Sequence, residues 1–137
     1  MTKIESKKVR LYVDRQTVFN FLRNLDNLIE LLPQSRISDW KSDQISCSFK
    51  VQGSYQIGMK HGGEEAPGFL KLSSGEGSPF PFELNITLTE HEKGCEVAQI
   101  CEAKINPFLE MIVKGPLKNL FDYIADKMVE KFGGEAI

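Results

Sequence analysis

The sequence predicts an α+β fold in which a curved antiparallel sheet of seven strands packs against one long C-terminal helix. From residue 36 to residue 105, apolar and polar side chains alternate in short runs separated by Gly, Ser, Asp and Pro, which is typical of antiparallel strands. From residue 107 to residue 132 the apolar spacing becomes that of a helix. Each strand has one apolar face, so the apolar stripe of this helix is their natural common partner.

One strand and two short helices are predicted before the run of strands. Residues 4–13 end in an alternation of apolar and polar side chains, which indicates the first strand. Asp14 follows, and its carboxylate is expected to accept a hydrogen bond from an amide in the first turn of a helix over residues 15–25. A second helical piece over residues 26–33 ends at Pro33, which discourages continuation. These two pieces are expected to form a bent helical pair.

Six further strands complete the predicted sheet. The alternation is clearest in residues 80–89, where five large apolar side chains share one face. In residues 95–105 the charged Glu96 and Glu102 mark the outer face, which places Gln99 on the inner face with the cysteines. The predicted strands comprise residues 36–41, 44–51, 54–60, 69–74, 80–89 and 95–105.

The terminal helix is expected to begin near Pro107 and to end at Gly133-Gly134. Gly115-Pro116 should bend it, because proline lacks the amide hydrogen and crowds the preceding turn. The predicted core stripe of this helix comprises Phe108, Ile112, Val113, Leu117, Leu120, Phe121, Ile124, Met128 and Phe132.

Length and composition indicate one globular domain over residues 1–137. Hydrophobic residues make up 41% and charged residues 26%, and the formal net charge of -2 disfavours nucleic acid as a partner. No apolar run approaches the length of a membrane-spanning helix, and the first twenty residues lack a signal pattern, so a cytoplasmic location is expected. Three cysteines without CxxC spacing argue against disulfides and zinc.

The order of elements is that of the helix-grip fold, in which a curved sheet wraps around a terminal helix. The chain resembles the START-like superfamily, also called SRPBCC, and within it the polyketide cyclase/dehydrase and lipid-transport family of bacterial proteins. The resemblance lies in DRQTVFNFLRNLDNLIELLP (14–33), WKSDQISCSF (40–49) and KINPFLEMIVKGPLKNLFDYIADKMVEKF (104–132). Arg15 departs from the family, which frequently has proline there. These motifs specify a fold more than an activity.

Chemical motifs are sparse. His61 and His91 are expected at a strand end and in a hairpin turn, exposed and without a catalytic role. Gly75-Glu76-Gly77-Ser78-Pro79 runs into proline instead of a helix, so it indicates a turn and not a phosphate-binding loop. The inner faces of the strands hold no ionisable acid or base, and Asp39 or Glu102 would enter only through a bulge or a shifted strand parity.

The resemblance implies a small hydrophobic ligand, such as a lipid or a polycyclic molecule, bound between the sheet and the terminal helix. Two alternatives remain open: a polyketide cyclase-like enzyme, and a scaffold whose large side chains fill the interior. No catalytic residue, metal or cofactor is predicted, and self-association stays open. The expected ligand-binding residues are Phe49, Tyr55, Ile57, Leu70, Phe82, Leu84, Gln99, Cys101, Leu117 and Phe121.

Overall fold

A computed structural model describes residues 1–51 and 55–137. Within these residues the chain forms nine strands, two α-helices and one 3-10 helix. The elements follow one another as β1 (Thr2–Glu5), β2 (Val9–Leu11), α1 (Arg15–Arg23), η1 (Leu25–Leu31), β3 (Ile37–Asp43), β4 (Ser46–Val51), β5 (Gln56–Glu65), β6 (Phe69–Ser74), β7 (Phe82–His91), β8 (Gly94–Ala103), α2 (Pro107–Phe132) and β9 (Gly134–Ala136).

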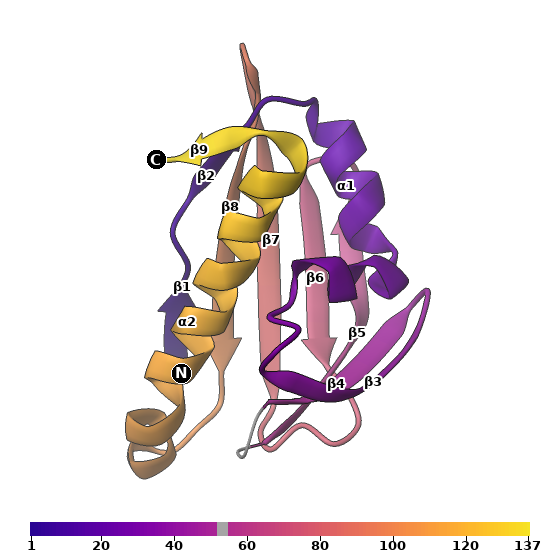
Figure 1. The fold of residues 1–137 in the computed structure, drawn as a ribbon. Helices are drawn as coiled ribbons and strands as arrows, with labels where there is room; N and C mark the ends of the chain where they lie inside the picture. The colour runs from indigo at the N-terminus through magenta and orange to yellow at the C-terminus, as the bar shows by residue number, and fades with distance from the viewer. Residues whose placement is uncertain (52–54) are drawn as a thin grey trace.

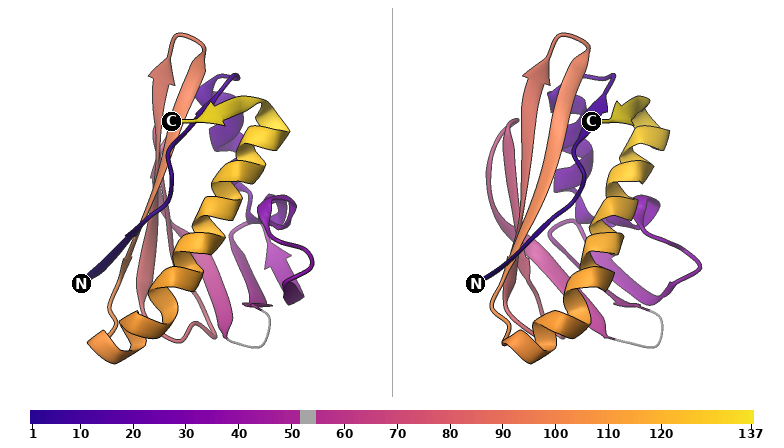
Figure 2. Two further views of the ribbon diagram at one scale, coloured as in Figure 1. Left: turned by 60° about the vertical axis from the view of Figure 1, so that its left-hand side comes forward. Right: turned by 90° about the vertical axis from the view of Figure 1, so that its left-hand side faces the viewer.

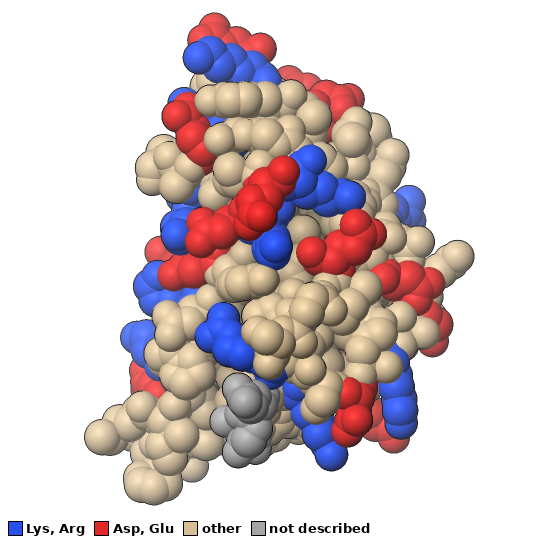
Figure 3. Space-filling view, viewed as in Figure 1, with Lys and Arg blue, Asp and Glu red and all other residues tan. Residues whose placement is uncertain are grey.

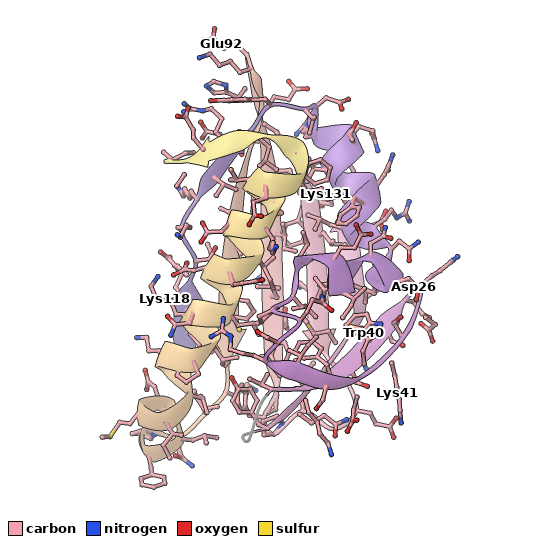
Figure 4. The ribbon with its side chains drawn as sticks, in the orientation of Figure 1. Asp26, Trp40, Lys41, Glu92, Lys118 and Lys131 are labelled. Carbon is pink, nitrogen blue, oxygen red and sulfur yellow. The ribbon has the colours of Figure 1, made fainter. Side chains whose placement is uncertain are left out.

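All nine strands of the described residues belong to one antiparallel sheet with the order β3-β4-β5-β6-β7-β8-β2-β9, and β1 also pairs with β8. The sheet curves so that α2 and α1 lie on the same side of it (Figures 1 and 2). Near the end of α2, the Lys131 ammonium lies 3.1 Å from the Glu30 carboxylate of η1, which ties the terminal helix to the helical pair (Figure 4). The predicted α+β class is therefore confirmed, with a larger sheet than expected.

The predicted first strand, residues 4–13, is two strands. Both pair with β8, with Ile4 opposite Cys101 and Val9 opposite Val97. Between them the Lys7 amide donates to the Asp122 carboxylate of α2 at 2.7 Å, so the chain turns from the sheet toward the helix at this point. This contact between distant segments explains why the local pattern gave no sign of the break.

The short strand β9 was not predicted. Gly133 ends α2 as expected, with φ at 78°, and the chain then turns back so that β9 pairs with β2. A Cβ atom on Gly134 would lie 2.0 Å from the Arg10 carbonyl oxygen, so the strand approaches as closely as it does only because this residue is glycine. Gly133-Gly134 therefore ends the helix and also begins an edge strand.

Several predicted element boundaries shift. The HGGEE segment, residues 61–65, falls in the connection between the predicted strands 54–60 and 69–74 but belongs to β5. The predicted strand start at Ser54 lies outside the described residues. Asp14 precedes α1 as predicted, but its carboxylate accepts from the Thr17 hydroxyl instead of a helix amide. The second helical piece is a 3-10 helix over Leu25–Leu31.

The core lies between the inner face of the sheet and α2, which runs without interruption through Pro116. Figure 2 shows the first turns of α2 lying at an angle to the rest, in agreement with the predicted bend. The predicted stripe is wrong in these turns, because Phe108 and Ile112 are exposed. Among the described residues, no helix combines the length and apolar character needed to cross a membrane.

Candidate functional site

A small enclosed cavity lies between α2 and the inner face of the sheet. Its volume is about 10 Å³, which is roughly the space that one water molecule needs. Apolar side chains and one cysteine surround it, so the site offers no strong hydrogen-bonding group to a water. The lining residues are Ile57, Met59, Pro79, Phe80, Phe82, Cys101, Leu117, Leu120 and Phe121.

The structure brings half of the expected ligand-binding residues to this cavity. Strand β5 supplies Ile57, β7 supplies Phe82, β8 supplies Cys101, and α2 supplies Leu117 and Phe121. Four others, Phe49, Leu70, Leu84 and Gln99, are buried in the surrounding core, and Tyr55 is half-buried against it.

Four lining residues were absent from the expected set. Met59 shares a strand face with Ile57, Phe80 precedes Phe82 by two residues, and Leu120 belongs to the predicted helix stripe, so the spacing contained a signal for all three. Pro79 sits in a predicted loop, and no periodicity pointed to it.

Gln99 faces the interior, as the charge pattern of β8 predicted. It is 2% exposed, and its Nε2 donates to the Phe121 carbonyl at 3.1 Å and to the Ser6 hydroxyl at 3.3 Å. The amide was expected to meet a water or a ligand, yet it joins β8 to the backbone of α2 and to the β1–β2 connection. Glu102 lies exposed on the outer face, so the strand parity is as predicted.

Tyr55 packs against the core and presents a buried polar atom there. Its phenol oxygen has no hydrogen-bond partner among the described residues, and burial raises the pKa of the phenol. Tyr55 precedes Ile57 by two residues, which directs both side chains to the same side of the chain in an extended backbone. A buried hydroxyl without a partner is costly, so this oxygen has hydrogen-bonding capacity that the described residues leave unused.

The cysteines of the interior are poor nucleophiles. Burial raises the pKa of Cys47 and of Cys101 to about 12, and it raises the pKa of Cys95 as well. All three are free and buried, and at neutral pH they hold their protons.

Thr2 and Gln99 are the buried polar residues of the described chain, so the interior supplies no carboxylate, imidazole or amine for proton transfer. Asp39 is exposed and pairs with Lys50 at 3.3 Å. No group of His, Cys, Asp and Glu in the described ranges is arranged to hold a metal ion.

A polar cluster on the sheet escaped prediction. His61 Nε2 lies 2.8 Å from Glu64 Oε1, and the same oxygen is 3.1 Å from the guanidinium of Arg23 at the end of α1. Residues three apart face opposite sides of a regular strand, but a bulge between His61 and Gly63 brings these two together. The double glycine of HGGEE was the feature of the sequence that could have indicated this bulge. The ion pair between Arg23 and Glu64 joins α1 to β5.

No protein-family profile matches this chain, and no curated protein matches it. Solved structures do resemble it. A conserved protein from Geobacillus kaustophilus has a TM-score of 0.66 at 17% identity, with 95% of this chain and 91% of that chain covered. The Aha1 dimer from Colwellia psychrerythraea has a TM-score of 0.68 at 12% identity, covering 97% and 98%. A protein from Deinococcus radiodurans has a TM-score of 0.64 at 13% identity, covering 96% and 98%. At these identities the likeness shows a shared fold.

Proposed function

We propose that the protein binds a small hydrophobic molecule, such as a lipid or a polycyclic compound, between the sheet and α2. The observation that carries the proposal is the enclosed apolar cavity bounded by β5, β7, β8 and α2. The order of elements, which is that of the helix-grip fold, and the resemblance to the START-like superfamily support this class of ligand. Tyr55 Oη would bind one polar group of the molecule.

Binding requires the cavity to open. Pockets for small molecules measure roughly 300–1,000 Å³, whereas the space present here is about 10 Å³. Phe80 and Phe82, whose ring centroids lie 6.1 Å apart, fill the end of the interior near the first turns of α2. Gly115 is exposed and a Cβ atom on it would meet nothing within 4 Å, so this side of α2 faces solvent just before Pro116. Room for the ligand would come from movement of the two phenylalanine rings away from Leu117, Leu120 and Phe121, which form the α2 wall of the cavity.

A scaffold with a filled core is the second candidate. It is favoured by the small volume of the cavity and by the internal hydrogen bonds of Gln99, which leave this amide engaged without a ligand. A polyketide cyclase-like enzyme has weaker support, because the buried polar residues of the described chain include no ionisable side chain.

The two leading candidates predict different behaviour of Leu84→Trp. Leu84 lies opposite Cys101 and two residues from Phe82, both of which line the cavity. Leu88→Trp is the matched control, because Leu88 is also buried on the same face of β7, roughly 13 Å farther along the strand. The assay is binding of an apolar fluorescent probe and its displacement by fatty acids or polycyclic compounds.

A ligand site predicts that the wild type binds the probe, that Leu84→Trp loses this binding while remaining folded, and that Leu88→Trp retains it. A filled scaffold predicts no probe binding by the wild type and a loss of roughly 1–3 kcal/mol of stability in both variants. The second outcome would refute the proposed function.

A further inference from the structure

The first turns of α2 expose three large apolar side chains. Phe108 is 73% exposed, Met111 is 85% exposed and Ile112 is 55% exposed. We call these three residues the α2 tip. They stand three and four positions apart, so they share one face of the helix. Single exposed apolar residues are ordinary on protein surfaces, but a contiguous set at the end of an element marks an interaction site.

The α2 tip is a second apolar face on a helix that already has one. Val113 is buried, and Leu109, four residues before it, is half-buried against the core. These two side chains make the contact between this part of the helix and the core. The α2 tip therefore has no partner within the described chain, and Figure 3 shows its end of the molecule as a corner free of charged side chains on the viewed face.

The charges beside the α2 tip have the sign that suits an anionic surface. Residues 104–118 contain Lys104, Lys114 and Lys118 against Glu110 alone, a formal charge of +2 in a chain whose net charge is -2. Lys104 and Lys114 are exposed, and Lys114 lies 3.9 Å from Glu110, whereas Lys118, labelled in Figure 4, pairs with Asp122 at 2.8 Å. Lysines beside an apolar helix face can keep their ammonium groups at lipid headgroups while the stems cover apolar surface.

The shape and area of the α2 tip favour a lipid surface over a second protein. At about 200 Å² for each large side chain, the exposed fractions leave on the order of 400 Å² of apolar surface. A standard protein interface buries roughly 800 Å² on each partner. Figure 2 shows the first turns of α2 projecting at one end of the molecule, a convex shape that a fluid bilayer accommodates.

We propose that the α2 tip inserts into the surface of an anionic lipid bilayer, with Lys104 and Lys114 at the headgroups. The proposal rests on the exposed side chains and their charges, and it holds whether or not the interior binds a ligand.

The test is sedimentation of the full chain with vesicles of phosphatidylcholine mixed with phosphatidylglycerol. The double variant Phe108→Ser/Met111→Ser removes most of the α2 tip, and Ile45→Ser is the control, because Ile45 is 67% exposed in the turn between β3 and β4. We expect the double variant to bind these vesicles at least about tenfold more weakly than the wild type, since partial burial of two large side chains is lost. The control should bind as the wild type does.

Met111→Trp gives a second readout on the same surface. Its indole emission should shift to shorter wavelength when the mixed vesicles are added, and added salt or vesicles of phosphatidylcholine alone should weaken the shift. The proposal is overturned if the wild type stays in solution with mixed vesicles and the indole emission does not move. It is also overturned if the double variant binds as well as the wild type, or if the α2 tip mediates a concentration-dependent dimer in place of vesicle binding.

Discussion

Replacing Gln99 with Glu tests the burial of this side chain with almost no change of shape. Gln99 is 2% exposed and donates to Phe121 O and Ser6 Oγ. A carboxylate at this site loses both donors and, when ionised, is removed from water. Burial of this degree raises a carboxyl pKa by up to about 3–5 units from an unfolded value near 4.3. The folded Gln99→Glu protein should therefore hold its proton to about pH 7 or above.

The sign of the pH effect follows from proton binding. Between about pH 4.3 and the raised folded pKa, the unfolded chain has released the proton and the folded chain retains it, so stability falls as pH rises. The slope is about 1.36 kcal/mol per pH unit, and between pH 5 and pH 7 the variant should lose about 2.7 kcal/mol beyond any change in the wild type. At pH 5 a smaller loss should persist, because a protonated carboxyl can still donate one hydrogen bond to Phe121 O.

Urea unfolding of wild type and variant at both pH values measures this difference. Gln56→Glu is the control, since Gln56 is exposed on β5, and its stability should follow that of the wild type to within about 0.5 kcal/mol. If Gln99→Glu shows the same pH dependence as the wild type, the carboxylate reaches water, and the placement of Gln99 between β8 and α2 is wrong.

Gly94→Ala should destabilise the fold by about 1–3 kcal/mol, because Gly94 has φ at 148° and a Cβ atom would lie 2.1 Å from the Leu11 carbonyl oxygen. Gly115→Ala should instead stabilise α2 by about 0.5–1 kcal/mol, since its Cβ meets nothing within 4 Å; urea unfolding of the pair would contradict this reasoning if both changes had the same sign. The Cys47 and Cys101 thiols, with pKa raised to about 12, should resist a thiol-specific disulfide reagent at pH 8 until the protein unfolds. They should also make stability fall as pH rises above about 9, because the unfolded thiols ionise while the folded ones stay protonated; rapid labelling of the native protein would exclude their burial.

The sheet and the terminal helix could be predicted because their side chains repeat with the period of the backbone. In β7 the inner residues Phe82, Leu84, Ile86 and Leu88 are all buried, and in β8 the charged Glu102 marked the outer face correctly. Alternation follows from the two-residue period of a strand, so it can be recognised without knowledge of contacts to distant segments. Gln99 could be placed for the same reason, although its partner on α2 could not be inferred.

The features that escaped prediction depend on contacts between distant segments. The break between β1 and β2 coincides with a hydrogen bond from the Lys7 amide to Asp122, 115 residues away. Strand β9 exists because Gly134 can approach Arg10, and HGGEE is a strand because its bulge lets His61 meet Glu64. Local composition indicated a continuous strand in the first case and a helix end or a connection in the other two, and tertiary pairing decided the outcome.

A shared interior between the helix and the sheet could be expected from the sequence, but its free volume could not. One apolar helix face against many apolar strand faces implies a shared interior, yet a sequence does not state how tightly the side chains fill it. Phe80, Phe82 and Phe121 fill nearly all of it here, leaving about 10 Å³. Pro79 also closes the cavity, and a residue in a loop has no periodicity by which it could have been assigned to that wall.

Pro116 divides α2 into two parts with different partners, which a single apolar stripe could not reveal. After Pro116, Leu117, Leu120 and Phe121 pack against the sheet and line the cavity. Before it, the bend carries Phe108 and Ile112 off the core, while Val113 alone remains buried. The part of α2 before Pro116 therefore carries the α2 tip, and the part after it forms the wall of the cavity. If the protein exchanges a hydrophobic ligand with a bilayer, the α2 tip and the cavity wall meet at Gly115-Pro116, so Gly115→Ala should slow ligand exchange by stiffening the helix between them without changing which ligand binds.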